Sequence, residues 1–335
     1  MGTEFAILIV HYGRAQTTAE CVKSIYEVYK ENETSPFILV VDNDSLANPI
    51  ASHIQFYPSV KVITLNRNVG FGEANNIGHR WIYENERFEH LIFLNNDTVI
   101  FDESLTRLSH VLRDSHPSVI ATVPKIVFMH DPEEVWCGLG KLNAVNLDPA
   151  VKLQIGSDIK DKPVDTDFGS GCCMCIRMRD RIFSNGVFLS ALFLYEEDVE
   201  LCWRFKKAGR NILYIDFAVV KHSVGLASKV KGEEKLYGLD PRRERFSEIL
   251  YYRVRNKILV NHIHLNSFKR CVFWFFYLPK LFRIFLRCLL VGRARVFFLT
   301  VKNSILDSRS ILASSDTVYS LPPQRIGLPG KDNQY

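Results

Sequence analysis

Four short apolar runs in the first third of the chain narrow its fold more than any other feature. They are rich in Ile, Leu, Val and Phe, and they lie at residues 6–10, 37–41, 60–65 and 91–94. Polar or amphipathic segments of helix-compatible length separate them. A strand buried on both faces of a sheet reads as such a continuous apolar run. The alternation therefore predicts an α/β fold, with a Rossmann-like, mostly parallel sheet flanked by helices.

Charge is distributed unevenly along the 335 residues. The chain has a net charge of +5, but residues 251–335 carry 14 Lys and Arg against 3 Asp and Glu, which leaves residues 1–250 at −6. An acidic body argues against nucleic-acid binding, so we expect no nucleic-acid partner. A basic, apolar C-terminal part favours an anionic membrane surface instead.

The cysteines and the N-terminus contain no zinc or export signal. Eight cysteines are scattered without the paired spacing of a zinc site, and we interpret the cluster of Cys172, Cys173 and Cys175 as small apolar residues of a buried strand. The first apolar run leads directly into polar residues, unlike a signal peptide. We therefore expect a reduced protein in the cytoplasm.

Polar residues follow three of the apolar runs, and the carboxyl ends of parallel strands meet at one rim where ligands bind. Asp42 could accept hydrogen bonds from a base or ribose. Asp97, with Asn95 and Asn96, offers the oxygen ligands that Mg²⁺ or Mn²⁺ prefers. The glycine-rich segment 66–78 predicts a loop that a ligand's phosphates could approach. Helix capping and turn formation are the alternative roles for all of these residues.

The second half of the chain supplies a candidate base. Asp198 stands where a helix is expected to begin, and an ionised carboxylate there could deprotonate an acceptor hydroxyl. Capping of that helix is the competing interpretation. His222 follows a predicted strand at 212–215 and could be a nitrogen ligand or a structural histidine. Residues 224–247 are predicted to form an exposed loop that could cover a site.

Residues 268–302 contain eight Lys or Arg and no Asp or Glu, among many aromatic and aliphatic residues. Their longest uncharged stretch is far shorter than the ~20 residues that span a bilayer. Lys280, Arg283 and Arg287 recur at helical spacing, as in a helix lying in the membrane interface. Packing on the body or on a partner subunit is the alternative, and homo-oligomerisation is left open.

These observations predict three parts. A catalytic domain covers residues 1–250, with halves that meet near residue 123. A basic aromatic helical extension covers 251–308, and residues 309–335 form a loose tail.

A series of motifs then points to a family. In order they read VHY, VVDNDS, NRNVGFGEANNIG, FLNNDT, GSGCCMCIR and FLYEEDVELCWR, followed by Gly209, His222 and Ser228. Over residues 5–260 the chain resembles the family 2 glycosyltransferases, and within them the rhamnosyltransferase-like branch of bacterial surface-polysaccharide (O-antigen) biosynthesis. The resemblance implies a type-A glycosyltransferase fold and metal-dependent, inverting transfer of rhamnose or a similar hexose. The expected donor is a dTDP- or UDP-sugar, the acceptor is a lipid-linked saccharide, and the enzyme is peripheral on the inner face of the cytoplasmic membrane.

The resemblance also implies roles for particular residues. Asp198 is the expected base, and Asp97 and His222 are the expected metal ligands. The expected contacts to donor, sugar or acceptor are Tyr12, Asp42, Asn75, Asn95, Asn96, Gly169, Ser170, Gly171 and Glu197. Two positions depart from the family pattern: Asn95 stands where many relatives have Asp, and Gly13 stands where Asn commonly follows Tyr12. The segment containing Tyr251, Tyr252, Arg255 and Asn256 recurs in this branch without a role that the residues explain.

Two rival functions stay open. A sugar nucleotidyltransferase would share the nucleotide-binding fold, but the lysine-rich glycine loop expected for a triphosphate is absent after the first strand. A non-catalytic glycan-binding or scaffold protein could keep the same fold. A dehydrogenase is disfavoured because no GxGxxG follows the first strand.

Overall fold

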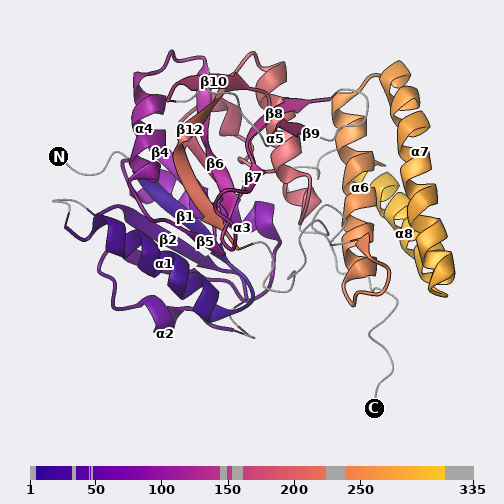
Figure 1. The fold of residues 1–335 in the computed structure, drawn as a ribbon, viewed down its shortest axis with the longest axis horizontal. Helices are drawn as coiled ribbons and strands as arrows, with labels where there is room; N and C mark the ends of the chain where they lie inside the picture. Colours follow the sequence, from indigo (N-terminus) through magenta and orange to yellow (C-terminus); the bar gives the residue numbers. More distant parts are fainter. Residues whose placement is uncertain are drawn as a thin grey trace. The chain divides into compact units, whose positions relative to one another are not determined.

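The computed structural model describes residues 5–31, 35–44, 46, 48–143, 149–152, 161–223 and 239–313 (Figure 1). The chain forms two compact units. The sheet unit comprises Met1–Leu142, Pro149–Leu189 and Glu197–Val224, and the helical unit comprises Asn143–Asp148, Ser190–Glu196 and Gly225–Tyr335. The units interleave along the chain, and the chain passes for the last time from the sheet unit to the helical unit at residues 224–225. The predicted functional division into 1–250, 251–308 and 309–335 stays a prediction.

The first half of the sheet unit follows the predicted alternation. Its elements are β1 (Phe5–His11), α1 (Ala15–Tyr29), β2 (Phe37–Asp42), α2 (Ala51–Ile54), β3 (Val60–Thr64), α3 (Phe71–Asn85) and β4 (His90–Asn95). The strands pair in parallel in the order β3-β2-β1-β4. All seven residues of β1 are buried, as expected of a central strand covered on both faces.

The second half is more irregular. Its elements are β5 (Thr98–Val99), α4 (Ser104–Asp114), β6 (Val119–Phe128), β7 (Val135–Cys137), β8 (Leu139–Leu142), β9 (Pro149–Lys152), β10 (Pro163–Thr166), β11 (Cys173–Arg177), a 3₁₀ turn (Arg181–Phe183), α5 (Glu197–Lys207) and β12 (Asn211–His222). β11 is antiparallel to both β4 and β6, and β10 is antiparallel to β12, whereas β12 is parallel to β6. The expectation of a mostly parallel sheet is therefore wrong for this half, and the sheet as a whole is mixed. A run buried on both faces reads the same in either direction, so its pattern carries no orientation.

The cysteine interpretation is confirmed. Cys172, Cys173 and Cys175 are free and buried in or beside β11. Burial raises the pKa of the Cys175 thiol to about 12, which keeps it protonated at neutral pH.

One predicted loop is partly a helix. α3 begins at Phe71 after Gly70, whose φ of 91° favours glycine, so Asn75 lies in the helix and not in a loop. Gly78 belongs to the same helix, and a Cβ there would lie 2.4 Å from Leu8 Cδ1. The glycine at this position therefore allows α3 to approach β1 closely and has no need of a ligand to explain it.

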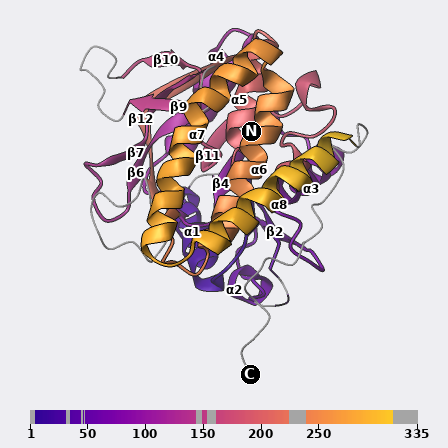
Figure 2. The same cartoon turned by 90° about the vertical axis from the view of Figure 1, so that its right-hand side faces the viewer.

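The helical unit contains α6 (Phe246–His264), α7 (Ser267–Leu290) and α8 (Ala294–Ala313), together with the 3₁₀ turn Ser190–Leu192 (Figure 2). α8 packs against both α6 and α7. The helix predicted around Lys280 is thus present as α7. α8 runs to Ala313, past the start of the predicted tail at 309, and residues 314–335 lie outside the described part. So do residues 224–238 of the predicted covering loop and Ser228. Among the residues that the structure describes, no helix is long and apolar enough to cross a bilayer.

Candidate active site

The carboxyl ends of β1, β2 and β4 lie side by side, as the parallel pairing requires. His11 is opposite Asp42 in the register of β1 and β2, and Val10 is opposite Asn95 in the register of β1 and β4. The Asn96 side chain donates a hydrogen bond to the Tyr12 carbonyl oxygen over 3.1 Å. The structure therefore brings the residues predicted from separate strand ends to one rim, the place where ligands bind in open α/β sheets.

Asp42 is more deeply buried than its predicted role suggested. Its carboxylate is 1% exposed, and its two oxygens accept the backbone N–H groups of Asp44 and Ile50, each over 3.2 Å. These bonds hold the turn after β2. Asp44, which the sequence analysis passed over, is more exposed and accepts the Gly13 N–H over 3.2 Å. Contact of Asp42 with a nucleobase stays a prediction.

Asn75 and Asn76 have structural partners. Asn75 is buried in α3, one turn after Phe71, and its amide donates to the Phe71 carbonyl over 3.0 Å. The Asn76 side chain accepts the Val187 and Phe188 N–H groups and donates to the Phe188 carbonyl. Asn76 therefore anchors the chain after β11 to α3, whereas Asn75 bonds within the helix. A donor contact by Asn75 stays a prediction.

Asp97 and His222 meet although 125 residues separate them. β12 pairs antiparallel with β5, which places His222 opposite Thr98, and the Ser223 N–H donates to the Asp97 carbonyl over 2.8 Å. As a result the His222 Nε2 lies 3.0 Å from the Asp97 Oδ1. The imidazole packs edge-on against Trp136, at 4.6 Å between ring centroids. Its Nδ1 is buried without a hydrogen-bond partner among the described residues.

This pair is suited to a divalent cation. An imidazole nitrogen and a carboxylate oxygen are both acceptable to Mn²⁺, whereas Mg²⁺ prefers oxygen ligands alone. No group of three or more His, Cys, Asp or Glu side chains that could hold a metal occurs in the described part of the chain. Asp97 and His222 could supply two ligands to such an ion, whose other ligands would be a phosphate group and water.

The Asp198 carboxylate lies at the start of α5, beside the glycine segment that precedes β11. Its Oδ2 accepts the Gly171 N–H over 3.2 Å, and its Oδ1 accepts the Val199 N–H over 2.8 Å. Glu197, the first residue of α5, is half-buried next to it. Asp198 is the second residue of α5, so its carboxylate is in the first turn, where the helix dipole favours a negative charge. Its bond to Val199 joins adjacent residues and is not the bond that a capping side chain makes.

The glycine segment is shaped by its neighbours. A Cβ on Gly169 would lie 2.3 Å from Val123 Cγ1, a distance that no real side chain tolerates. Ser170 is buried, and its Oγ accepts the Cys172 N–H over 3.2 Å. Both residues therefore set the backbone path that presents the Gly171 N–H to the carboxylate.

A buried ion pair that the motifs did not indicate lies within α5. Glu200 is fully buried, and Arg204 contacts both of its carboxylate oxygens at 2.9–3.2 Å. Arg204 also donates to the Gly186 carbonyl over 3.2 Å. The i, i+4 spacing of opposite charges was the available signal.

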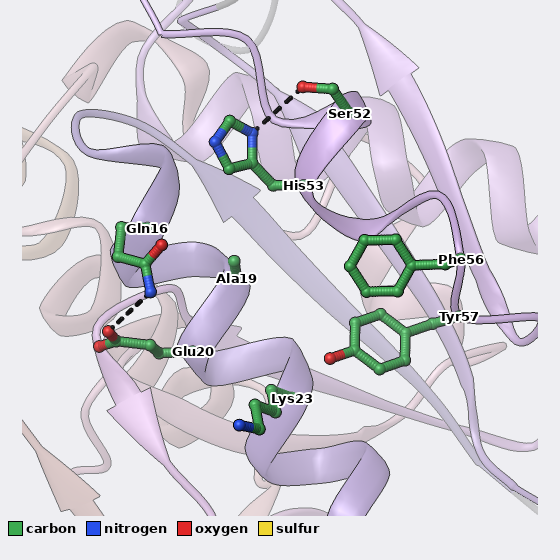
Figure 3. A pocket seen from close by; sticks show the side chains of 8 residues that line it. All are labelled: Gln16, Ala19, Glu20, Lys23, Ser52, His53, Phe56 and Tyr57. Carbon is green, nitrogen blue, oxygen red and sulfur yellow. Dashed lines mark hydrogen bonds between the residues drawn. The ribbon is translucent and has the colours of Figure 1, made fainter.

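The surface also has a pocket of about 380 Å³ between α1 and α2 (Figure 3). Gln16 donates to Glu20 over 3.0 Å, and Ser52 lies 3.2 Å from the His53 ring nitrogen, so much of its polar lining is paired internally. It contains none of the predicted site residues, and we do not assign it to the site.

Comparison with known proteins identifies the class. The family model for glycosyl transferase family 2 matches residues 6–182, which is more than half of the chain. The chain belongs to this family, as its motifs predicted. The matched region ends before Asp198 and His222.

Two relatives show which kinds of glycosyltransferase the chain is similar to. The chain is 26% identical over 216 residues to the low-salt glycan biosynthesis hexosyltransferase Agl10 of Haloferax volcanii, a match that covers 62% of this chain and 64% of Agl10. It is 26% identical over 221 residues to the rhamnosyltransferase WbbL of Escherichia coli K12, covering 62% of this chain and 79% of WbbL. The chain thus spans slightly less than two thirds of the length of Agl10.

Solved structures share the fold. GalNAc-T7, crystallised with UDP, GalNAc and Mn²⁺, aligns with a TM-score of 0.59 and 15% identity, over 81% of this chain and 49% of that one. The mannosyltransferase PcManGT of Pyrobaculum calidifontis, in complex with GDP-Man and Mn²⁺, aligns with a TM-score of 0.51 and 12% identity. This alignment covers 93% of this chain and 79% of PcManGT. The fold is therefore of the type-A glycosyltransferase kind, with a mixed sheet.

Proposed function

We propose that this protein is an inverting, metal-dependent glycosyltransferase. It moves rhamnose or a similar hexose from a dTDP- or UDP-sugar to a hydroxyl of a lipid-linked saccharide, in the assembly of a cell-surface polysaccharide such as O-antigen. Family membership supports transfer from a nucleotide-sugar, and the rhamnosyltransferase WbbL and the hexosyltransferase Agl10 support the sugar class.

One observation carries this proposal: the Asp198 carboxylate and the strand end that leads to Asp97 bind neighbouring residues of one short segment. The Gly171 N–H binds Asp198, and the next residue, Cys172, accepts the Asn95 N–H at its carbonyl over 2.8 Å. Asn95 is two residues before Asp97, whose carboxylate contacts His222. This arrangement supports the proposal of a cation site for a diphosphate and a base for a hydroxyl near one end of β4 and β11.

The mechanism is a single displacement. The acceptor hydroxyl attacks the anomeric carbon from the face opposite the nucleotide, so its O–C bond forms as the bond from carbon to the diphosphate oxygen breaks. Asp198 takes the hydroxyl proton, and the configuration at carbon inverts. Asp97 and His222 would hold the divalent ion, which when bound neutralises charge on the departing diphosphate. The Gly171 and Val199 N–H groups orient the Asp198 carboxylate during the proton transfer.

The test is transfer from a panel of dTDP-, UDP- and GDP-sugars to lipid-linked saccharides, with product anomer assigned by NMR. Asp198→Asn should reduce kcat by at least ~10²-fold, within the range for loss of a general base, while donor affinity changes little. Asp165→Asn, an exposed aspartate of β10, is the matched control and should transfer normally. Substantial transfer by Asp198→Asn would remove the base assignment, and release of pyrophosphate from a nucleoside triphosphate would indicate a nucleotidyltransferase.

We also propose that α7 places the enzyme on the inner face of the cytoplasmic membrane. α7 has two apolar sides. Phe273, Tyr277, Leu281 and Cys288 are buried, whereas Phe268, Phe275, Phe276, Leu278, Phe282, Leu286, Leu289 and Leu290 are exposed. Most of the second set repeats at intervals of three, four or seven residues, so it covers the side opposite the buried one.

Charge favours a membrane over a second protein chain. Lys280 and Arg283 are exposed beside the apolar side, and residues 268–302 contain no acid, so a second copy would bring like charges together. An anionic lipid surface contributes about 1 kcal/mol for each Lys or Arg near it, and full burial of each Phe or Leu about 1.5–3 kcal/mol. These contributions together are sufficient for reversible binding in the interface plane.

Vesicle flotation of the full chain tests this. The wild type should float with phosphatidylglycerol vesicles but not with pure phosphatidylcholine, and salt should weaken the binding. Phe275→Asp with Phe282→Asp should abolish flotation, whereas Leu46→Asp with Phe56→Asp, at two exposed apolar residues of the sheet unit, should not. Equal flotation of both double variants would contradict the proposal, as would a wild-type dimer that the α7 variant dissociates without any vesicle binding.

A further inference from the structure

The segment just before the candidate base has an unusual backbone. Phe193, Tyr195 and Glu196 adopt left-handed φ values of 63°, 69° and 71°, although none is glycine. Such conformations persist only where the surroundings hold them, and they concentrate at functional sites. The segment Ser190–Glu196 belongs to the helical unit, and the chain continues from Glu196 directly into α5, whose second residue is Asp198.

Two buried side chains of α6 hold the carbonyl groups of this segment. The Arg255 Nη2 donates to the Ala191 and Leu192 carbonyls, each over 2.7 Å. The Asn256 Nδ2 donates to the carbonyls of Leu192 at 2.9 Å, Leu194 at 2.8 Å and Tyr195 at 2.7 Å. Arg255 and Asn256 are buried. The left-handed φ values bend the segment Ser190–Glu196, and its carbonyl groups cannot form regular secondary-structure hydrogen bonds there, so these two side chains supply the donors instead.

Further contacts hold the side chains of Phe193 and Glu196 in this bend. The Lys257 Nζ lies 2.7 Å from the Glu196 Oε2, in a pair whose side chains are 5% and 12% exposed. The Phe193 ring stacks on Tyr252 at 5.2 Å between centroids. Phe193 and Glu196 are therefore held through their side chains, and Tyr195 is held through its carbonyl group.

We propose that Arg255, Asn256 and Lys257 are positioning residues for the reaction. They set the backbone from Ser190 to Glu196, and through the continuous chain they set the first turn of α5, on which Asp198 stands. This inference rests on the proposed role of Asp198 as base. It assigns a function to the Tyr251–Asn256 region that the residue pattern alone did not explain.

Proton transfer is sensitive to such placement. A displacement of about 1 Å in a reacting group can cost ~10²-fold in rate without loss of any chemical group. Removing the Asn256 donors leaves the Leu194 and Tyr195 carbonyls without this partner, whereas the Leu192 carbonyl still accepts from Arg255. We therefore expect the bend to relax and the orientation of the base to suffer, while the donor-binding strand ends are unchanged.

The experiment compares Asn256→Ala with Asn261→Ala in the full-length enzyme. Asn261 is a buried asparagine on the same helix, and its amide nitrogen has no hydrogen-bond partner among the described residues. Two readouts are combined: hydrogen exchange of peptides covering residues 190–199, and kcat and KM for transfer. Asn256→Ala should exchange faster there and lose at least ~10-fold in kcat, with donor KM changed less than about twofold. Asn261→Ala should change neither readout.

A second variant separates the hydrogen bonds from side-chain volume. Asn256→Asp keeps the size but replaces the amide donors by acceptors, so it should behave like Asn256→Ala. If Asn256→Ala does not fold, Lys257→Met, which removes only the ion pair to Glu196, is measured in the same way with the same expected direction.

The outcomes distinguish this inference from the proposed function. Unchanged exchange in Asn256→Ala, or equal losses of kcat in Asn256→Ala and Asn261→Ala, would overturn the positioning role in an active enzyme. A wild type that transfers no sugar would overturn the proposed function and the positioning role with it, while the exchange data would still show whether α6 holds the segment.

Discussion

Replacement of Gly169 by alanine tests how the glycine segment is held beside Asp198. The Gly169 backbone suits an L side chain, because its φ is not in the left-handed region, so any effect comes from space alone. The new Cβ would lie 2.3 Å from Val123 Cγ1, 3.1 Å from its Cβ and 3.2 Å from its Cγ2. Apolar carbons normally stay about 3.5–4.0 Å apart, so the closest contact overlaps by more than about 1 Å.

The loss of stability in Gly169→Ala depends on whether Val123 or the glycine segment can shift. Val123 is a stiff β-branched residue inside β6, and its backbone is held opposite Tyr214 of β12, so the glycine segment must shift instead. Overpacking of this kind costs about 1–3 kcal/mol. Gly169→Ala should therefore lower the melting temperature by about 2–4 °C for each kcal/mol lost. It should also slow transfer, because the segment carries the Gly171 N–H that binds Asp198.

The double variant Gly169→Ala with Val123→Ala gives the decisive comparison. Val123→Ala alone removes two methyl groups and should cost about 1–3 kcal/mol through the space it leaves. In the double variant the added methyl group occupies that space, so the double loss should fall short of the summed single losses by at least about 1 kcal/mol. Thermal unfolding and transfer rate are measured on all four proteins. Strictly additive losses, or a fully stable Gly169→Ala, would refute the steric reasoning.

Two further predictions concern the metal pair and the cysteines. Asp97→Ala and His222→Ala should each weaken donor binding in Mn²⁺, measured by calorimetry, and bring it close to the affinity in EDTA; affinities that match the wild type in both conditions would contradict the ligand roles. At a mildly alkaline pH of about 8, the exposed Cys271 should react with iodoacetamide far faster than Cys175, because burial raises the pKa of Cys175 to about 12 and so keeps that thiol protonated. Mass spectrometry that locates rapid labelling at Cys175 in the native protein would contradict this.

The local order of apolar and polar residues was sufficient to predict many of the strands and helices. The runs that became β1, β2 and β4 were recognisable because a strand covered on both faces needs apolar side chains at nearly every position, and polar residues after the strands were expected at one rim. The run that became β3 is at the edge of the sheet and is partly exposed. α7 was recognisable from the spacing of Lys280, Arg283 and Arg287. The start of α3 was misjudged, since glycine and asparagine around Gly72 suit a loop as well as a helix that packs tightly on a sheet.

Candidate site residues could be named from the sequence, and their roles stay predictions, but their arrangement could not be predicted. The motif series indicated the family, and the chemistry available to Asp97, His222 and Asp198 could be read from their types and positions along the chain. The hydrogen-bond partners of these three residues could not be predicted from the sequence. Hydrogen bonds between distant residues depend on strand pairing and direction, which apolar patterns do not encode.

By itself, then, the sequence determined the alternation of strands and helices, the family and the acids and imidazole available for chemistry, since these depend on residue type and local spacing. Only the tertiary structure decided that β11 runs antiparallel, that β12 brings His222 to Asp97, and that α6 holds the bend before Asp198. Each of these depends on contacts between residues far apart in the chain, and such contacts form only when the whole unit packs.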